Sequence, residues 1–274
     1  MILKLIDNKI RRAFSNSALQ YEALTGLHKE IGRELIHKVS LDVGLDVGMV
    51  PIPSLKILDV GMGTGWLTRR VKSFFPEALV LGLDFSDGMI DAARQHQDNF
   101  QIIQADANEL PFKNECFDLI VSNLAYQWID DLTGAFRRSH AILKRGGRFS
   151  FTMFGRATFQ ELFVAFEHSL EKCVHEKKQD FPVRRLAGQK DIEAAMKRAG
   201  FVDVNVDFER IKVRFMDMMD LLQWTKNIGA NNLEKNIYVG KDLLLRANDY
   251  YNMHFKDAFG ITATFEVIWA SGRK

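Results

Sequence analysis

The sequence predicts an α/β fold in which a doubly wound, mostly parallel sheet carries helices on both faces. Short and nearly continuous apolar runs, as expected for strands buried on both faces, alternate with segments whose apolar residues recur every three or four positions. The first such run, KILDV (56–60), leads into a glycine-rich turn and then into a helical pattern. Strand–helix alternation of this kind builds parallel sheets.

Seven segments are predicted as strands: KILDV (56–60), LVLGLD (79–84), FQIIQAD (100–106), FDLIVSN (117–123), RFSFTMF (148–154), VDVNVDFERIKVRF (202–215) and ITATFEVIWASG (261–272). Helical patterns over 64–75, 87–96 and 131–143 lie between the early strands, and two more helices are expected within 8–40. The segment KRGG (144–147) is expected to end the helix before it, because cations and glycines favour helix termini.

The second half of the chain departs from this rhythm. Helices are predicted over 156–178, 189–200, 216–233 and 241–255. We interpret those around 155–185 and 216–255 as a helical cap over the carboxyl edge of the sheet, where open α/β sheets hold ligands. The predicted organisation is therefore N-terminal helices (1–45), a ligand-binding core (46–154), and cap helices (155–274) that include the last core elements: helix 189–200 and strands 202–215 and 261–270.

Composition excludes several function classes. The 274 residues are 47% apolar and 26% charged, with a net charge of +2. These values give no reason to expect nucleic-acid or membrane binding, and no apolar run approaches the length of a membrane span. Cys116 and Cys173 are far apart, which argues against a metal site and favours reduced thiols. We expect a cytoplasmic monomer without a metal.

The glycines of DVGMGTG (59–65) indicate a ligand site. Glycine allows positive φ and lets backbone N–H groups approach a ligand closely. A dinucleotide fingerprint would place its third glycine at position 66, which is Trp66. The loop therefore predicts a nucleotide-like ligand of another kind.

Acidic residues near three strand ends strengthen this hypothesis. Asp84 ends the second predicted strand, where a carboxylate can accept both ribose hydroxyls. Asp106 ends the third strand, close to where an adenine edge would lie, and Asp59 precedes the glycine loop. Each Asp alone is also compatible with a turn or helix cap.

The segments LDVGMGTGWLT, LGLDFSDGMI, QADANELPF, FDLIVSN and LKRGGRF, within 57–153, resemble the successive motifs of class I S-adenosylmethionine-dependent methyltransferases. The resemblance implies a Rossmann-like sheet and S-adenosylmethionine as cofactor, with the glycine loop passing under its methionine part. It also implies the cofactor contacts, which we expect at Asp59, Gly61, Gly63, Gly65, Asp84, Phe85, Met89, Asp106, Ala107, Asn123 and Leu124.

Further strings resemble one branch, the malonyl-acyl-carrier-protein O-methyltransferases of biotin synthesis: AFSNSALQY (13–21), SNLAYQWIDDL (122–132), KNIGANNL (226–233) and TFEVIWA (264–270). This resemblance implies methyl transfer to the free carboxylate of malonyl-acyl-carrier protein, or of malonyl-CoA, and thus a methyl ester that primes the pimeloyl chain of biotin. The partner would be an acyl-carrier protein bearing malonyl-phosphopantetheine. Alternatives are another small carboxylate substrate, or a respiratory-complex assembly factor that modifies a protein arginine.

The same resemblance places Tyr21, Asn123, Gln127 and Trp128 around the reacting centre. A carboxylate entering a capped site must be paired, and a guanidinium is the usual partner. We expect Arg185 in this role, with Arg184 and Lys226 as alternatives. The basic segments 175–178 and 183–185 are compatible either with docking of an acidic carrier protein or with ordinary solvated charges.

Overall fold

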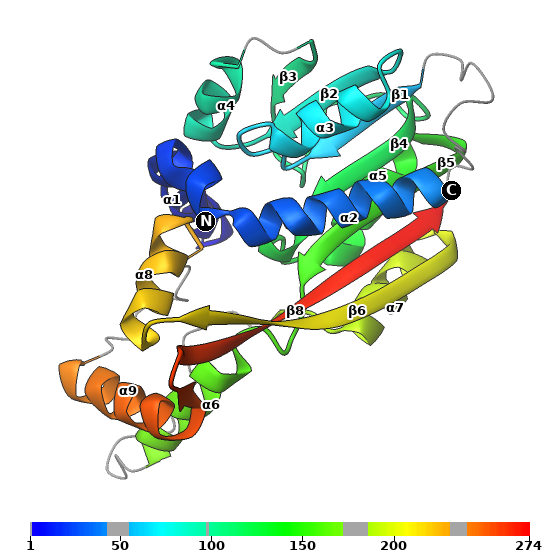
Figure 1. Cartoon of the computed structure of the whole chain (residues 1–274). Coiled ribbons are helices and arrows are strands. Elements are labelled where there is room, and N and C mark those ends of the chain that lie inside the picture. The colour runs from blue at the N-terminus through cyan, green and yellow to red at the C-terminus, as the bar shows by residue number, and fades with distance from the viewer. Residues whose placement is uncertain (1, 43–54, 97–98, 172–185, 231–239) are drawn as a thin grey trace.

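The computed structural model describes residues 2–42, 55–96, 99–171, 186–230 and 240–274 (Figure 1). The strands of this part are β1 (Lys56–Val60), β2 (Leu79–Asp84), β3 (Gln101–Gln104), β4 (Phe117–Asn123), β5 (Leu143–Phe154), β6 (Val202–Phe215), β7 (Lys256–Asp257) and β8 (Gly260–Arg273). The helices are α1 (Ile2–Leu24), α2 (Gly26–Asp42), α3 (Trp66–Phe74), α4 (Asp87–Arg94), the 3₁₀ turn η1 (Tyr126–Trp128), α5 (Leu132–Ile142), α6 (Gln160–Glu171), α7 (Gln189–Ala199), α8 (Met218–Asn227) and α9 (Lys241–Phe255).

The strands form one sheet in the order β3-β2-β1-β4-β5-β8-β6, and the short β7 pairs with β8. Strands β1 to β5 are parallel, whereas β8 runs antiparallel between β5 and β6. The predicted Rossmann-like, mostly parallel architecture is confirmed, with β7 added to the seven predicted strands in the described part. The direction of winding reverses between β1 and β4, and such a switch point is where open α/β sheets bind ligands.

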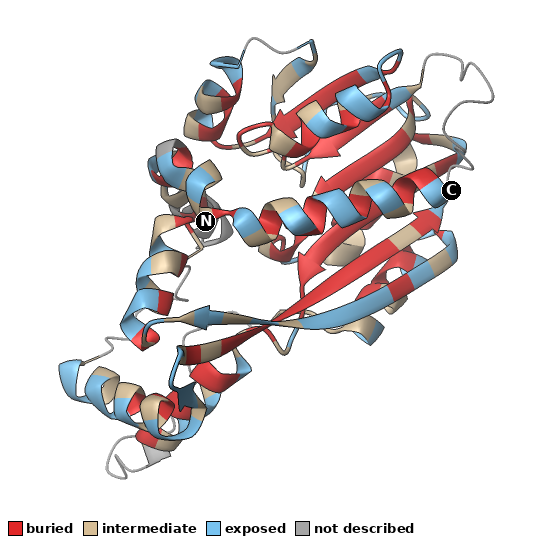
Figure 2. Cartoon of the chain, in the orientation of Figure 1, coloured by how far each residue is buried: buried red, intermediate tan, exposed pale blue. Residues whose placement is uncertain are grey.

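Several predicted bounds coincide with the structure, namely those of β1, β2, β4, β6 and α9. The central strands β1 and β4 are buried along most of their length, so their apolar runs give a clear signal (Figure 2). Helix starts also follow from local chemistry. The Ser86 side chain accepts a hydrogen bond from Met89 N–H at the start of α4, and Asp131 accepts one from Gly134 N–H at the start of α5.

The prediction for KRGG (144–147) is wrong. Helix α5 ends at Ile142, and this segment belongs to β5. Gly146 N–H donates to the carbonyl of Lys274 at 3.0 Å, and Lys274 N–H donates to the carbonyl of Gly147 at 2.9 Å. Backbone bonds to the far end of the chain thus hold the segment extended, and a local pattern does not contain that information.

Two helices of the second half are shorter than predicted. Helix α6 begins at Gln160, because Phe159 has a positive φ of 61° and its N–H donates to the carbonyl of Thr264 at 2.7 Å. Helix α8 begins after Asp217, whose side chain accepts a hydrogen bond from Asp220 N–H, and it ends at Asn227. Residues 172–178 and 231–233 of the predicted helices lie outside the described residues.

Three apolar layers hold these elements together. On one face of the sheet, α5 and α7 cover β4 and β5, and on the other, α2 and α3 cover β1 and β4 (Figure 1). A further cluster joins α6, α8 and α9 to the outer half of β8. Of the described helices, none has both the length and the apolar character needed to cross a membrane.

Candidate active site

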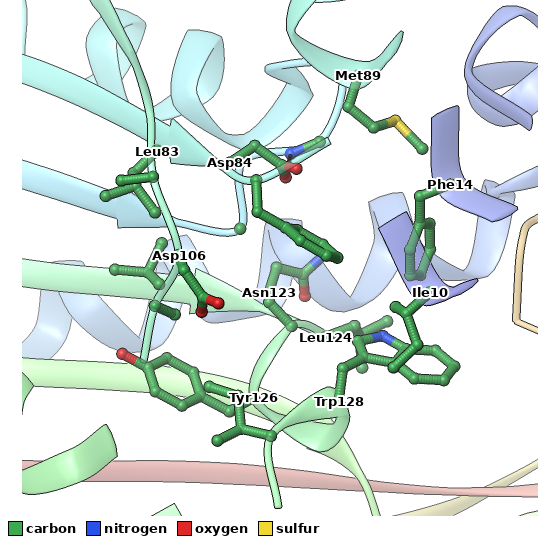
Figure 3. A pocket seen from close by; sticks show the side chains of 18 of the residues that line it. Ile10, Phe14, Leu83, Asp84, Met89, Asp106, Asn123, Leu124, Tyr126 and Trp128 are labelled. Atoms are coloured by element: carbon green, nitrogen blue, oxygen red, sulfur yellow. Dashed lines mark hydrogen bonds between the residues drawn. The ribbon is translucent and has the colours of Figure 1, made fainter. Parts of the chain in front are cut away.

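The carboxyl ends of four parallel strands meet at one edge of the sheet. Gly61 directly follows β1, Asp84 is the last residue of β2, and Asn123 is the last residue of β4. Asp106 follows β3 by two residues. All four line one cavity, and Figure 3 shows Asp84, Asp106 and Asn123 around it.

This cavity, called the first cavity, encloses about 800 Å³. Its wall consists of Ile10, Phe14, Tyr21, Val60, Gly61, Gly63, Leu83, Asp84, Phe85, Met89, Ala105, Asp106, Ala107, Asn108, Asn123, Leu124, Ala125, Tyr126, Trp128 and Ile129. An apolar wall with a few polar groups is typical of sites for small organic ligands.

The three glycines of the loop after β1 have different structural roles. All have positive φ: 73° at Gly61, 56° at Gly63 and 81° at Gly65. A Cβ on Gly61 would overlap Ala125, whereas a Cβ on Gly63 would meet no atom within 4 Å. Gly65 is the N-cap of α3 and does not line the first cavity. Gly63 is therefore the glycine that keeps space free for a ligand.

Asp84 is buried beside this loop. One carboxylate oxygen accepts a hydrogen bond from Gly63 N–H at 2.9 Å, and the other accepts one from Ser86 N–H at 2.8 Å. Burial raises the pKa of Asp84, and the backbone hydrogen bonds oppose the rise. The bonds fix the direction of the carboxylate towards the cavity, and its oxygens retain lone pairs that can accept ligand hydroxyls.

Asp59 is fully buried behind the glycine loop. Thr68 donates to its Oδ2 at 2.7 Å, but its Oδ1 has no hydrogen-bond partner among the described residues. Burial, reinforced by the Asp84 carboxylate, raises the pKa of Asp59 to about 7. Asp59 lines a smaller cavity, called the loop pocket, which consists of Tyr21, Glu22, Thr25, His28, Lys29, Asp59, Gly61, Met62, Gly63, Thr64, Trp66, Leu67 and Asn123. Its unpartnered oxygen is suited to a cationic group that enters this pocket.

At the far end of the first cavity, Asp106 also forms a turn. Its Oδ1 accepts a hydrogen bond from Asn108 N–H at 2.7 Å, so Asp106 forms a turn and also lines the cavity. Phe85, Met89 and Ala107 complete this end of the wall.

The end of β4 and the residue after it form part of the cavity walls. Asn123 donates to the carbonyl of His28 at 3.0 Å and accepts a hydrogen bond from Thr152 Oγ1 at 2.7 Å. Leu124 has a φ of 56°, which is uncommon for a residue other than glycine and typical of functional sites. Its N–H donates to Thr152, and this bond supports the conformation.

Helix α1 covers the first cavity with Ile10, Phe14 and Tyr21. Figure 3 shows Ile10 and Phe14 in this position. Arg11 makes two hydrogen bonds of 2.7 Å to Asp87 at the start of α4. Burial, with the Asp84 carboxylate as a second cause, raises the pKa of Tyr21. The sequence pattern singled out Tyr21 alone, although Phe14 and Ile10 follow the spacing of one helical face and could have been found from it.

A second cavity, of about 780 Å³, adjoins the first and shares Phe14, Tyr21, Leu124 and Trp128 with it. Its remaining lining residues are His28, Gln127, Phe154, Thr158, Phe159, Phe163, Leu186, Trp224, Ile228 and Ala230. They come from α2, η1, α6, α8, the end of β5 and connecting segments, so elements distant in sequence build this space. Among its described lining residues there is no lysine or arginine.

Gln127 and Trp128 belong to different parts of the second wall. Gln127 is buried, and its Oε1 accepts a hydrogen bond from Phe154 N–H at 2.9 Å. Since that partner is a donor, the carboxamide nitrogen of Gln127 must point elsewhere. Trp128 lies in both walls and packs edge-on against Phe14, with ring centroids 5.4 Å apart.

Most predicted site residues lie in the first wall: Tyr21, Gly61, Gly63, Asp84, Phe85, Met89, Asp106, Ala107, Asn123, Leu124 and Trp128. Asp59 lines the loop pocket and Gln127 the second cavity. Lys226 is exposed and lines neither large cavity. The predictions for Arg184 and Arg185 lie outside the described residues. His28 was not predicted, and no sequence motif marked it.

Comparison with known proteins shows similarity over nearly the whole chain. A family model described as a methyltransferase domain matches residues 58–151. The malonyl-[acyl-carrier protein] O-methyltransferase of Geobacter sulfurreducens is 31% identical, with 98% of this chain and 100% of the relative covered. The enzyme of that name from Hahella chejuensis is 33% identical, with 95% and 88% covered. Among solved structures, the YcgJ protein of Bacillus subtilis matches 87% of this chain and 99% of its own with a TM-score of 0.58 and 18% identity, which supports the fold.

Proposed function

This chain belongs to the malonyl-[acyl-carrier protein] O-methyltransferase family, and we infer that it transfers a methyl group from S-adenosylmethionine to the free carboxylate of a malonyl group on an acyl-carrier protein. The observation that carries this inference is the pair of adjoining cavities at the sheet edge, one beside the glycine loop and one lined mainly by aromatic and aliphatic side chains. Their shared wall is where a donor and an acceptor would meet. By the resemblance of its motifs, the ester product would enter biotin synthesis.

The residues around the first cavity and the neighbouring loop pocket fit S-adenosylmethionine. Asp59 has an unpartnered buried oxygen that suits the amino group of a methionine part. Gly63 leaves open space where a Cβ would stand, and Asp84 presents a fixed carboxylate to ribose hydroxyls. When bound, this cofactor supplies a methyl group on a sulfonium. The protein's contribution is to hold it along the ends of β1, β2 and β4.

The reaction needs no general base, because a malonyl carboxylate is ionised at neutral pH. The work of the chain is then to position the carboxylate and to exclude water, and alignment of this kind contributes up to about 7–11 kcal/mol in well-oriented systems. Tyr21 and Trp128 lie in the walls of both cavities and are the residues we assign to the reacting centre. Gln127, whose Oε1 holds the Phe154 backbone, is assigned to the substrate side.

The partner is proposed from the names of the relatives: an acyl-carrier protein that presents malonyl-phosphopantetheine. Malonyl-CoA carries the same reacting group and is the alternative. Arg185 stays the predicted partner of the carboxylate, and the cytoplasmic location and the monomeric state also stay predictions.

Mass spectrometry of malonyl-acyl-carrier protein incubated with the enzyme and S-adenosylmethionine tests the proposal. We expect the gain of one methyl group on the malonyl carrier and none on acetyl-acyl-carrier protein, which lacks the free carboxylate. Malonyl-CoA, offered in parallel, decides between the two thioesters. Absence of a methyl ester from both malonyl thioesters, with cofactor binding shown by calorimetry, would contradict the proposed substrate.

A further inference from the structure

A malonyl carboxylate in the second cavity would meet no cationic side chain in the described part of the wall. The lining of this cavity is dominated by aromatic rings and aliphatic groups, and its described part offers no lysine or arginine. A carboxylate moved from water into such a space is strongly destabilised unless hydrogen bonds replace its hydration. Arg185, the predicted partner of the carboxylate, lies outside the described residues, so within the described wall only polar uncharged groups can contact a carboxylate.

Two of these polar groups are already engaged with the protein. Trp224 Nε1–H donates to the carbonyl of Leu24 at 3.0 Å. Thr158 Oγ1 lies 3.2 Å from the Glu266 carbonyl, to which it donates, and 3.1 Å from the Glu266 N–H, from which it accepts. The remaining polar groups include the Tyr21 hydroxyl, the Gln127 carboxamide nitrogen and the His28 imidazole.

His28 differs from its neighbours because its ring is buried without a hydrogen bond. The residue is only 8% exposed, and its Nδ1 has no partner among the described residues. Buried polar atoms in native proteins are nearly always paired, so an unpaired one in a cavity wall requires an explanation.

His28 lies between the substrate side and the cofactor side of the proposed site. It lines both the second cavity and the loop pocket. The rings of Tyr21, Phe154 and Trp224 lie with centroids 6.0, 5.7 and 6.1 Å from it, and its backbone carbonyl accepts the hydrogen bond from Asn123. The imidazole is thus held on several sides by packing and forms part of the wall of both cavities.

We propose that His28 contacts the substrate and donates a ring N–H hydrogen bond to the malonyl carboxylate, an inference that rests on the proposed function and adds a substrate-recognition residue to it. Burial lowers the pKa of His28 to about 4, so at neutral pH the imidazole is an uncharged donor. A neutral donor orients a carboxylate and leaves its negative charge for attack on the methyl group. The methyl ester product lacks that charge and is held less strongly, which favours its release.

Ligand binding separates this role from simple packing. Trp128 and Trp224 line the second cavity, so their fluorescence reports on its occupancy. Malonyl-pantetheine and its methyl ester are titrated against the protein saturated with S-adenosylhomocysteine. The variants are H28F, which keeps an aromatic ring, H28Q, which restores an N–H donor, and H37F, which makes the same replacement at an exposed position of α2.

We expect H28F to bind malonyl-pantetheine roughly 10- to 100-fold more weakly, as for the loss of a hydrogen bond to a charged group, with little change for the methyl ester. H28Q should recover most of the affinity, and H37F should match the wild type. Because His28 also lines the loop pocket, saturation with S-adenosylhomocysteine is verified by calorimetry for each variant before malonyl-pantetheine is added. Where H28F does not fold, H28L makes the same comparison, since leucine also removes the donor.

Unchanged malonyl affinity in H28F, or an equal loss for acid and ester, would overturn the proposal, because the first excludes a contact and the second indicates packing alone. Failure of the proposed function has another signature. In that case the wild-type protein binds malonyl-pantetheine through His28 but forms no methyl ester when S-adenosylmethionine is supplied.

Discussion

Two buried carboxylates, Asp59 and Asp84, flank the glycine loop from neighbouring strands, and their hydrogen bonds give them different capacities. Each oxygen of Asp84 accepts a backbone N–H, which fixes it as an acceptor for neutral hydroxyls. Asp59 has one hydroxyl partner and one unpartnered oxygen. Its protonation state therefore depends on whether a cation occupies the loop pocket.

That difference makes cofactor binding pH-dependent. Burial raises the pKa of Asp59 to about 7, so below this pH the ligand-free protein holds Asp59 largely protonated. A cationic amino group at Oδ1 favours the carboxylate, so binding must release this proton and weakens as pH falls. We expect cofactor affinity to rise between about pH 5.5 and 7, by up to roughly tenfold per unit. Calorimetry over a pH series measures the slope, and Asp59→Asn should flatten it; an equal slope in Asp59→Asn contradicts the assignment.

The loop itself can be tested with two glycines in similar backbone conformations. Gly63 and Gly146 have φ values of 56° and 77°, and a Cβ on either meets nothing within 4 Å. Valine at either position carries the strain of left-handed backbone, about 1–2 kcal/mol. Only in Gly63→Val does the side chain enter the first cavity, so we expect no measurable S-adenosylmethionine binding there and normal binding in Gly146→Val. Far-ultraviolet circular dichroism should show both folded. Binding by Gly63→Val would remove the loop from the site.

At the scale of elements, α1 joins the cofactor side to the substrate side. Arg11 bonds Asp87 of α4, and Glu22 accepts hydrogen bonds from Thr64 at 2.8 Å and from Arg69 at 2.7 Å. The helix is thus fastened to the starts of both α3 and α4, with its apolar face over the cavities. Closure of the first cavity depends on how closely α1 approaches α4.

Helix α1 packs tightly against Gly88 of α4, where an added Cβ would lie 2.5 Å from the Ser15 carbonyl oxygen. Gly88→Ala should therefore lower the free energy of unfolding by about 1–3 kcal/mol, the usual range for overpacking, displace α1 and weaken cofactor binding. The matched control is Gly26→Ala, also in the first turn of a helix but with nothing within 4 Å of the added Cβ. Calorimetry gives the affinities, and hydrogen exchange should be faster along α1 in Gly88→Ala only. Equal affinities in the two variants would show that α1 does not close the site.

How far the sequence predicts these elements depends on where their signal lies. The apolar run 117–123 defines β4, and the strand-end positions of Asp84 and Asn123 follow from parallel topology. The extension of β5 through 144–147 depends on bonds to Lys274 and is invisible locally. The second cavity is harder still, because α2, α6 and α8 bring its residues together only through tertiary packing. His28 illustrates this, since its unpartnered Nδ1 and the rings packed around it are properties of the folded chain that no local pattern contains.

Over the whole molecule, the two cavities lie where separate parts of the chain meet. The first is bounded by the sheet, α4 and α1, and the second adds α8, whose Trp224 bonds the end of α1. Gly229, with a φ of 76°, lets the end of α8 approach the backbone of α1. Ligand binding in the first cavity should therefore affect α1 and α8 as well as the glycine loop.

Because these elements are connected, S-adenosylhomocysteine, which the cofactor becomes after methyl transfer, should stabilise the whole chain. A ligand at 100 times its dissociation constant stabilises the folded state by about 2.7 kcal/mol. For a chain of this size that corresponds to a rise in Tm of roughly 5–10 °C, measurable by scanning fluorimetry. Gly63→Val should show no rise in Tm and Gly146→Val the full rise.

Hydrogen exchange locates the stabilised elements. If α1 closes the site and α8 is fastened to it, protection should increase in the glycine loop, in α1 and in α8 together. Protection confined to the loop would mean that the cofactor and substrate halves are not coupled through α1.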